Sequence, residues 1–394
     1  MLKTKFLYKL FSSQIKTAEK AQILNKYKHL LEKASFITEE LFPKKMHSSE
    51  ELRNYLRVSE ISKNATIDGK EQINSINDGL FTPGWDMIKR GGKQWRPLLG
   101  LIIGNYFKMP IEDLNKSKLL YKLLAITQLI HNASLIVDDV EDKSLQRRNE
   151  PCVHLKFGEN VAINAGITMF YLPVYRLMKE INDTNLKAKI AEIYFEEMSA
   201  IHLGQGWDIE MKVENRLPSI DNYKDTVLFK TGVCPRLIIK SLMVLVEENP
   251  ENISALKDFM DIVDHISISF QIKDDLLNIT KSNLAKGKGY SGEDIFEGKL
   301  TLMVLHTLNS KDSNSRKERL KEILEMKTQD ENLINEAIEI LKSNTSIEFA
   351  NNIMENHVNK AEEICKKLQS NKNFNTEAIK DLLELINFLI DRNK

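Results

Sequence analysis

Apolar residues recur along this chain at intervals of three and four positions, which is the spacing of one face of an α-helix. The pattern is clearest in four segments: Leu119–Ile136, Leu186–His202, Ile253–Leu277 and Leu333–Leu341. The alternation typical of half-buried strands is almost absent, and glycine (16 residues) and proline (9 residues) are scarce. The pattern therefore predicts a large all-α protein built as a helical bundle.

Short stretches rich in glycine, proline and polar residues separate the helical segments. We expect a linker at residues 64–72, a turn at 81–85 and loops at 282–294 and 309–318. The apolar segment 165–178 contains Pro173, which predicts a buried and kinked helix.

The length of the chain bears on its domain organisation. The chain has 394 residues, whereas a single hydrophobic core rarely grows beyond ~250–300 residues. We therefore expect an N-terminal helical appendage at residues 1–70 and one main domain at residues 71–394.

Charge and cysteine content narrow the range of partners and compartments. Lysine plus arginine equals aspartate plus glutamate at 56 each, so we expect no nucleic-acid partner. Three widely spaced cysteines without metal-binding spacing indicate a reduced, intracellular protein. No apolar run reaches the ~20 residues that span a bilayer, so we expect no stable membrane anchor. The amphipathic N-terminus has only lysine as its cation, which favours a cytoplasmic location, with a mitochondrial presequence as the alternative.

The segment LIVDDVEDKSLQRR runs an apolar helical pattern directly into a cluster of acids. Asp138 and Asp142 are one turn apart and share a helix face, with Asp139 beside them. Carboxylates held this closely repel one another, and their oxygens suit Mg²⁺, which often bridges to substrate phosphates. Arg147 and Arg148 follow, and guanidinium groups can bind phosphate with two hydrogen bonds. The alternative is a solvated acidic helix end followed by a basic turn.

Two further segments extend this interpretation. FQIKDDLLN again runs an apolar helix into acids, Asp274 and Asp275, with Asn278 one turn after the first. Helical bundles commonly build metal sites from side chains on facing helices. In GGKQWRP, Lys93 and Arg96 follow two glycines that let the backbone turn tightly, so both cations could hold a second anionic group.

These segments resemble the trans-isoprenyl diphosphate synthases, and the geranylgeranyl diphosphate synthases in particular. Six motifs stand in the order of that family: GGKQWRP, HNASLIVDDVEDKSLQRRNEP, GQGWDIE, FKTG, FQIKDDLLN and GEDIFEGKLT. The resemblance covers about residues 75–390 and implies a single-domain helical bundle of the isoprenoid synthase type around a central cavity. It implies head-to-tail condensation of isopentenyl diphosphate with dimethylallyl, geranyl or farnesyl diphosphate, usually by a homodimer.

The same resemblance implies roles for individual residues. About three Mg²⁺ ions would be held by Asp138, Asp139, Asp142, Asp274 and Asp275. The allylic diphosphate would be bound by Arg147, Lys230, Lys299 and a loop lysine, either Lys288 or the alternative Lys286. Isopentenyl diphosphate would be bound without metal by Lys93, Arg96, His131 and Arg148. Polar groups near the reacting carbons would be Gln205, Thr231 and Gln271, with Asp208 and Asp294 supporting them.

Product length would depend on the depth of an apolar tunnel beneath the first acid cluster. Ala133 and Ser134, one turn before the acids, are small and leave the tunnel open. Met169, Phe170 and Tyr171 in a second helix would form its floor, which favours geranylgeranyl diphosphate over a longer polyprenyl product. In the alternative, these three residues are ordinary core.

Some positions depart from the family pattern, and two other functions remain open. Gln94 and Asn149 replace a usual arginine and glycine, and Pro235 with Arg236 follows FKTG where small or apolar residues are usual. A terpene cyclase would need no isopentenyl diphosphate site, which Lys93, Arg96 and Arg148 argue against. A non-catalytic subunit of a heteromeric synthase would tend to lose acids of the first motif, which is intact here.

Overall fold

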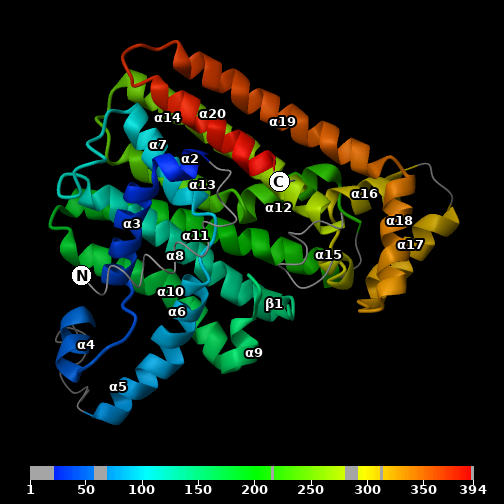
Figure 1. Cartoon of the computed structure of the whole chain (residues 1–394), viewed down its shortest axis with the longest axis horizontal. Coiled ribbons are helices and arrows are strands. Elements are labelled where there is room, and N and C mark those ends of the chain that lie inside the picture. Colours follow the sequence, from blue (N-terminus) through cyan, green and yellow to red (C-terminus); the bar gives the residue numbers. More distant parts are fainter. Residues whose placement is uncertain (1–21, 57–68, 214–216, 280–291, 311–313, 392–394) are drawn as a thin grey trace. The chain divides into compact units, whose positions relative to one another are not determined.

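The computed structural model describes residues 22–56, 69–213, 217–279, 292–310 and 314–391. In these ranges almost all regular structure is helical, and each of the two strands is two residues long (Figure 1). The prediction of an all-α protein is confirmed. The described part of the chain falls into two compact units, one within residues 1–105 and 109–190 and the other within residues 106–108 and 191–394.

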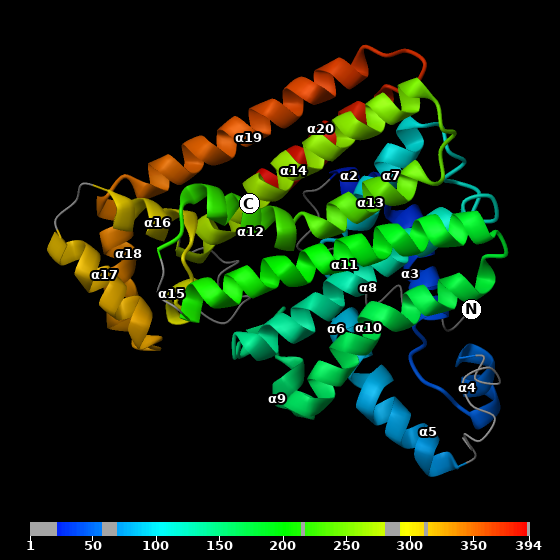
Figure 2. The ribbon, with the colours of Figure 1, turned by 180° about the vertical axis from the view of Figure 1, so that it is seen from behind.

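The first unit is built around one long central helix. Its elements are α2 (Gln22–Lys26), α3 (Lys28–Leu41), α4 (Ser49–Leu56), α5 (Lys70–Ile76), the π-helix η2 (Asn77–Phe81), α6 (Thr82–Lys89), α7 (Trp95–Tyr106), α8 (Lys118–Glu141), β1 (Gln146–Arg147), β2 (Glu150–Pro151), α9 (Val153–Phe157) and α10 (Glu159–Glu180). Helices α3, α6 and α10 all pack on α8, and Figure 2 shows α8 and α10 from behind. The segment predicted as a kinked helix lies in α10, which continues through Pro173.

A buried lysine fixes α3 and α10 to α8. Lys122 of α8 is only 3% exposed, lies 2.9 Å from a carboxylate oxygen of Glu40 in α3, and also pairs with Glu180 of α10. Leaving a buried charge without its partner costs about 3–5 kcal/mol. Helix α3 is therefore anchored within the first unit, while the domain boundary expected at residue 70 stays a prediction.

The turn predicted at residues 81–85 is wrong. Residues 70–89 run through α5, η2 and α6 without leaving the helical conformation. Pro83 lies in the first turn of α6. Proline has no backbone N–H, so it cannot donate a hydrogen bond to a carbonyl of the preceding π-helix. The π-helix that ends at Phe81 shifts the hydrogen-bond register at this point, so the proline is accommodated without a break.

The second unit contains the remaining helices. They are α11 (Thr184–Val213, whose first residues belong to the first unit), α12 (Ile220–Lys230), α13 (Val233–Met243), α14 (Pro250–Ile279), α15 (Glu293–Phe296), α16 (Leu302–Asn309), α17 (Asn314–Met326), α18 (Glu331–Ser343), α19 (Ser346–Gln369) and α20 (Glu377–Ile390). Helices α14, α19 and α20 pack side by side (Figure 1). Helix α17 begins at Asn314, so the loop predicted at 309–318 is shorter than expected.

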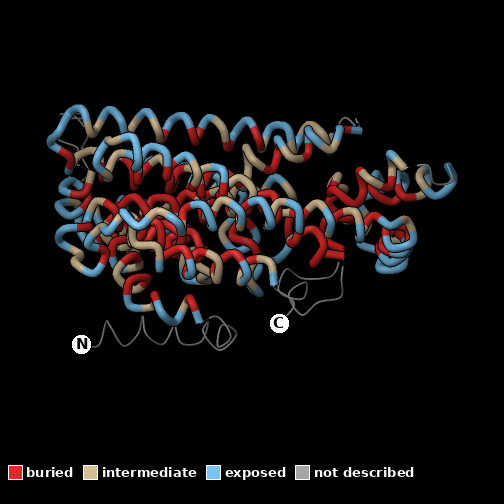
Figure 3. The backbone as a smooth tube through the Cα atoms, turned by 90° about the horizontal axis from the view of Figure 1, so that it is seen from above, coloured by how far each residue is buried: buried red, intermediate tan, exposed pale blue. Residues whose placement is uncertain are grey.

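Burial follows the helical period. Buried and exposed residues alternate along the helical tubes in Figure 3, as an amphipathic pattern requires. By length and composition alone, α8 and α10 could also cross a membrane. The most apolar 18-residue stretch of each helix is, however, 72% and 50% buried inside the protein, respectively. Core helices meet the same criterion, so it does not by itself indicate a membrane span.

A histidine pair joins α14 to α19 and predicts a pH effect on stability. The Nδ1 atoms of His265 and His357 lie 3.0 Å apart, so one ring must accept a hydrogen bond and be neutral. Burial, His265 and nearby lysines lower the pKa of His357 to about 4. An unfolded histidine titrates near about 6.5, so between about pH 6.5 and 4 only the unfolded chain takes up this proton. The contribution of His357 to the free energy of unfolding is therefore largest above about pH 6.5, and it decreases as the pH falls from about 6.5 to about 4.

We therefore expect the wild-type Tm to fall more than that of a His357→Gln variant between about pH 7 and about pH 5. Thermal unfolding followed by circular dichroism measures both. Equal falls in the two proteins would show that the histidine pair does not carry the effect.

Candidate active site

The acids of the first motif lie where α8 ends. Asp138 and Asp139 are in its last turn, and the backbone N–H of Asp142 donates to the Asp138 carbonyl at 2.8 Å and closes the helix. Asp139 is fully buried, while Asp138 and Asp142 are half-buried. Helix α8 is thus largely buried along its length and presents two carboxylates, Asp138 and Asp139, in its last turn.

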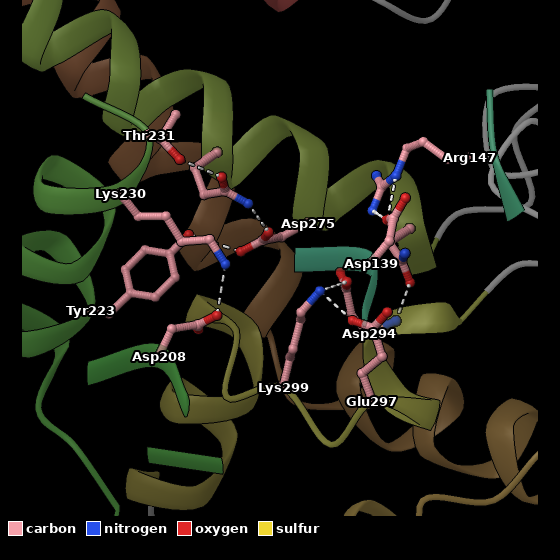
Figure 4. A network of polar contacts seen from close by, with 12 residues as sticks. Asp139, Arg147, Asp208, Tyr223, Lys230, Thr231, Asp275, Asp294, Glu297 and Lys299 are labelled. Atoms are coloured by element: carbon pink, nitrogen blue, oxygen red, sulfur yellow. Dashed lines mark hydrogen bonds and ion pairs between the residues drawn. The ribbon is translucent and has the colours of Figure 1, made fainter. Parts of the chain in front are cut away.

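Asp139 is paired with the first arginine of the motif. Arg147 Nε donates to Asp139 Oδ1 at 2.8 Å, and a second guanidinium nitrogen contacts the same oxygen (Figure 4). The other oxygen, Oδ2, is buried and has no N–H or O–H donor among the described residues, while the Cys152 thiol interacts with the same carboxyl group. Burial raises the pKa of Asp139, and Arg147 opposes that shift. A buried carboxylate oxygen without a donor is a position that a cation would stabilise.

The two arginines are presented by a tight hairpin. Strands β1 and β2 pair Arg147 with Glu150, so Arg148 and Asn149 form a two-residue loop. Both loop residues have positive φ angles, 56° and 64°, as the favoured hairpin turn requires. This conformation costs an ordinary residue about 1–2 kcal/mol, and glycine or asparagine adopts it most easily. Asn149, which stands where the resemblance leads one to expect glycine, therefore preserves the turn.

Positive groups cluster beside this hairpin. Arg148 Nη1 donates to Asn132 Oδ1 at 3.3 Å, and its guanidinium lies so close to Gly92 that a Cβ there would be 3.0 Å from it. Burial, Arg147 and Arg96 lower the pKa of Arg148 to about 10.

His131 lies among the same cations. Burial, followed by Arg96, Arg148 and Arg147, holds the pKa of His131 well below its usual range, so the ring is neutral at physiological pH. Like charges held this closely destabilise one another, and a bound anion would relieve the repulsion. The structure thus brings together three of the four residues predicted for isopentenyl diphosphate. Lys93, the fourth, is half-buried in the preceding loop.

In the second unit, α12 ends at two residues that the sequence predicted for the site, Lys230 and Thr231. Lys230 is its last residue, and its Nζ donates to Asp208 Oδ2 of α11 at 2.8 Å. Gln205, also predicted for the site, is half-buried one turn before Asp208. Asp208, predicted only as a supporting residue, is thus the carboxylate partner of Lys230.

A chain of hydrogen bonds links Thr231 to the second aspartate motif (Figure 4). Thr231 Oγ1 donates to Gln271 Oε1 at 2.9 Å, and Gln271 Nε2 donates to Asp275 Oδ1 at 2.8 Å. Tyr223 OH donates to Asp275 Oδ2 at 2.8 Å. Burial, together with the carboxylate of Asp294, raises the pKa of Asp275. Both oxygens of Asp275 thus accept hydrogen bonds within the protein, whereas Asp274 beside it is half-buried.

The polar end of α14 also holds the segment that carries Lys299. The backbone N–H of Asp294 donates to Asn278 Oδ1 at 3.2 Å, so the asparagine side chain fixes the start of α15. Lys299 Nζ lies 3.7 Å from Asp294 Oδ1 and forms a closer ion pair with Glu297. Asn278 therefore has a structural role that its place in the motif does not reveal.

The unusual pair Pro235 and Arg236 also has a structural explanation. Pro235 lies in the first turn of α13, where the backbone N–H has no partner within the helix, so no kink is needed. Arg236 Nη1 donates to the Leu228 carbonyl in the last turn of α12 at 2.8 Å and lies 3.3 Å from Asp264 Oδ1. Arg236 thereby fixes the end of α12 that carries Lys230.

Other predicted positions fall into two groups. Lys286 and Lys288 lie outside the described residues. Of the residues predicted to set product length, Ala133, Met169 and Phe170 are buried, Ser134 is half-buried, and Tyr171 is 49% exposed. Met169 packs into the core, since a Cβ at Gly84 would lie 2.9 Å from its sulfur. Their effect on the product stays a prediction.

Three residues near these groups escaped the sequence interpretation: Arg90, Tyr223 and Glu297. Arg90 contacts the β1–β2 hairpin, Tyr223 donates to Asp275, and Glu297 pairs with Lys299. The only local signal was the spacing of Asp86 and Arg90, which are one helical turn apart.

The donor set fits magnesium. Within the described ranges, no three His, Cys, Asp or Glu side chains gather closely enough to enclose a metal. Magnesium rarely needs such a cage, because it keeps several waters and binds one or two carboxylates together with substrate phosphates. The carboxylates of Asp138 and Asp139, with the free oxygen of Asp139, offer that kind of site.

Comparison with known proteins places these features in context. The family model described as polyprenyl synthetase matches residues 78–341. A short chain isoprenyl diphosphate synthase from Methanocaldococcus jannaschii is 33% identical over 274 residues, which cover 70% of this chain and 79% of that protein. A geranylgeranyl pyrophosphate synthase from Dictyostelium discoideum is 32% identical over 290 residues, covering 73% and 88%.

Solved structures share the fold. The geranylgeranyl pyrophosphate synthetase from Pyrococcus horikoshii superposes with a TM-score of 0.70 and 25% identity, covering 93% of this chain and 99% of that one. A polyprenyl synthase from Caulobacter crescentus, solved with calcium and isoprenyl diphosphate, has a TM-score of 0.69 at 18% identity, covering 94% and 97%.

Proposed function

The chain belongs to the polyprenyl synthetase family and is a prenyltransferase, and we propose that it condenses isopentenyl diphosphate with an allylic diphosphate to form geranylgeranyl diphosphate. The family assignment confirms the resemblance drawn from the six motifs and the isoprenoid synthase type of fold. The finer proposal is supported by the names of several relatives, among them geranylgeranyl pyrophosphate synthases from Metarhizium robertsii and Dictyostelium discoideum.

The observation that carries the proposal is the pair of Arg96 and Arg148 beside a neutral His131, with Arg147, paired to Asp139, next to them. Such a cluster suits a diphosphate that must be bound without a metal, because guanidinium groups match phosphate oxygens in geometry and charge. A terpene cyclase needs no second diphosphate, so this cluster favours chain elongation.

We propose that Mg²⁺ is held by Asp138, Asp139 and Asp142 and by Asp274, with Asp275 as a further ligand. Magnesium would neutralise the negative charge that develops on the departing diphosphate. The calcium and isoprenyl diphosphate bound by the Caulobacter crescentus relative support divalent metal use.

The protein's own groups would act on the substrates as follows. Arg147, Lys230 and Lys299 would bind the allylic diphosphate and stabilise it as its bond to carbon breaks. Lys93, Arg96 and Arg148 would hold the diphosphate of isopentenyl diphosphate, whose alkene then attacks the allylic cation. Thr231 and Gln271 form a hydrogen-bonded pair that can orient polar groups near the reacting carbons. The released proton would pass to the departing diphosphate or to water.

One assay tests the reaction. Purified protein, magnesium and labelled isopentenyl diphosphate are incubated with dimethylallyl, geranyl or farnesyl diphosphate in turn, and products are separated by chromatography. Incorporation of label into a prenyl diphosphate is the expected result. A hydrocarbon formed from one allylic substrate would indicate a cyclase instead, and activity that appears only with an added partner would indicate a regulatory subunit.

We expect Phe170→Ala to lengthen the product. Phe170 is 4% exposed in α10, and replacing a buried aromatic ring by a methyl group opens space for further isoprene units. Tyr171 was also predicted to form the floor, so Tyr171→Ala serves as the comparison. It should change the product length less, because the Tyr171 side chain is 49% exposed. Reversed-phase chromatography of dephosphorylated products measures the chain length, and unchanged products from Phe170→Ala would remove Phe170 from the floor.

We also propose a homodimer. Ile163, Ile167 and Tyr171 stand four residues apart on α10 and are 38%, 46% and 49% exposed. In the second unit, Phe195 and Leu203 of α11 are 60% and 56% exposed. Apolar stripes of this kind are typical of surfaces that bury against another chain.

Analytical ultracentrifugation tests this proposal. The wild type should sediment as a dimer, and Ile167→Glu should shift it towards monomer. A matched change at exposed Ile253 of α14, Ile253→Glu, should leave the dimer intact. A monomeric wild type would contradict the proposal.

We propose a cytoplasmic location. The described residues do not bear on it, because the lysine-rich segment lies within residues 1–21. A fluorescent fusion of the full chain tests this, and mitochondrial fluorescence would favour the alternative.

A further inference from the structure

Arg90 is a residue of the loop after α6 that reaches across to the β1–β2 hairpin. Its Nη1 donates to the Arg147 carbonyl at 3.1 Å and, at a longer 3.5 Å, to the Glu150 carbonyl. Its Nη2 donates to the Pro151 carbonyl at 2.7 Å. One guanidinium therefore holds backbone groups of both strands.

Arg90 is itself held rigidly. Its side chain is only 4% exposed, and its Nε donates to Asp86 Oδ2 at 3.0 Å. Asp86 also pairs with Lys156 of α9. A buried guanidinium with a paired carboxylate and three carbonyl acceptors has little freedom to move, so it fixes the position of whatever it holds.

The hairpin needs such support. A two-stranded hairpin is marginally stable in water, and here each strand has two residues. Its loop also holds Arg148 and Asn149 in the left-handed conformation, which arginine adopts at a cost. The backbone N–H of Cys152 donates to the Leu145 carbonyl at 3.1 Å at the base of the hairpin, and Arg90 adds three bonds to carbonyls of the hairpin itself.

The side-chain positions of Arg147 and Arg148 depend on a rigid hairpin to different degrees. Arg147 has a second tether, because its side chain is paired with the buried Asp139. Within the part of the chain that the structure describes, the Arg148 guanidinium lies against Gly92 and makes one side-chain hydrogen bond, at 3.3 Å to Asn132. A loosened hairpin would therefore displace the guanidinium of Arg148 more than that of Arg147.

We propose that Arg90 is a positioning residue that holds the hairpin so that Arg148 is aimed at isopentenyl diphosphate. This inference rests on the proposed function of the site. It gives the pair Asp86 and Arg90 a role in substrate selectivity: the pair sets the affinity for the substrate that Arg148 binds and affects the allylic substrate less.

The test compares the wild type with Arg90→Met. Calorimetric titration with isopentenyl diphosphate in the absence of magnesium measures the Kd of that site directly. We expect Arg90→Met to raise this Kd, and the KM for isopentenyl diphosphate, by about 10- to 100-fold, as small misplacements of binding groups do. The KM for the allylic diphosphate should rise clearly less. Equal rises in both KM values, or none in either, would overturn the proposal.

Two further variants separate positioning from loss of folding. Arg176 is a matched control, because it is a mostly buried arginine of the same unit that donates to a backbone carbonyl, that of Tyr55, at 2.6 Å. Arg176→Met should leave the ratio of the two KM values unchanged. Asn149→Gly, which makes the left-handed loop easier to adopt, should restore part of the affinity when added to Arg90→Met. Failure of that rescue would contradict a role through the hairpin.

If Arg90→Met does not fold by circular dichroism, Arg90→Lys and Asp86→Asn provide the same measurement. Lysine keeps the charge but cannot span the carbonyls of both strands, so the same selective rise is expected at smaller size. The absence of a selective rise in both would refute the inference. A wild type that neither binds isopentenyl diphosphate nor elongates would refute the proposed function itself, which is a different result.

Discussion

Asp138→Asn should lower kcat/KM by about 100- to 1000-fold. Asparagine keeps the shape of the side chain but offers a neutral oxygen in place of a carboxylate, so it binds Mg²⁺ far more weakly. Asp138 stands in the last turn of α8 and is half-buried, which leaves it able to meet an ion. Initial rates measured over a range of magnesium concentrations give the effect, and more magnesium should recover part of the loss.

Glu141→Gln is the matched control for this change. Glu141 is an exposed carboxylate in the same last turn of α8, and its replacement also removes one negative charge. We expect its kcat/KM and its magnesium dependence to stay close to those of the wild type. If both variants lost activity equally, the effect would belong to the general charge of the helix end and not to a metal ligand at Asp138.

Adjacent aspartates on α14 should respond differently to the same substitution. Asp274→Asn should lower kcat/KM by about 100- to 1000-fold with little change in Tm, because a half-buried carboxylate of the metal-binding motif is lost. In Asp275→Asn, the amide nitrogen would face a donor, either Gln271 Nε2 or Tyr223 OH. Losing one of these buried hydrogen bonds should reduce the free energy of unfolding by about 1–3 kcal/mol.

Two measurements decide between these roles. Rates as a function of magnesium concentration report metal binding, and chemical unfolding reports stability. We expect the magnesium requirement to shift strongly for Asp274→Asn and weakly for Asp275→Asn, with the stability loss in the reverse order. The same shift in magnesium requirement for both would mean that Asp275 is a metal ligand of equal weight, as the motif alone indicates.

Helices could be predicted well from the sequence because their signal is local. The apolar period through residues 119–136 and 253–277 lies within α8 and α14, and each pattern runs into the acids that end the helix. The turn expected at residues 81–85 failed because proline was taken as a break, whereas the π-helix that ends at Phe81 lets the helical segment continue through Pro83.

The partners of the functional residues were much harder to predict. Arg90 contacts Arg147 across 57 positions of the chain, and Tyr223 contacts Asp275 across 52. A backbone carbonyl is present in every residue, so no side-chain pattern marks the one that an arginine will bind. Arg236 shows the same limit, since its bond to the Leu228 carbonyl explained a residue that the sequence left without a reason.

The family, the all-α class and the types of the functional residues could be assigned before folding was considered, because helical periodicity and short charged motifs involve neighbouring positions. The tertiary structure decided which of those charges are buried, paired or left with an open oxygen. Burial and pairing depend on segments that meet only after folding, as Asp139 meets Arg147 at the end of α8 and Arg90 meets the hairpin beside it. Those contacts set the pKa values and orientations on which binding of a diphosphate depends.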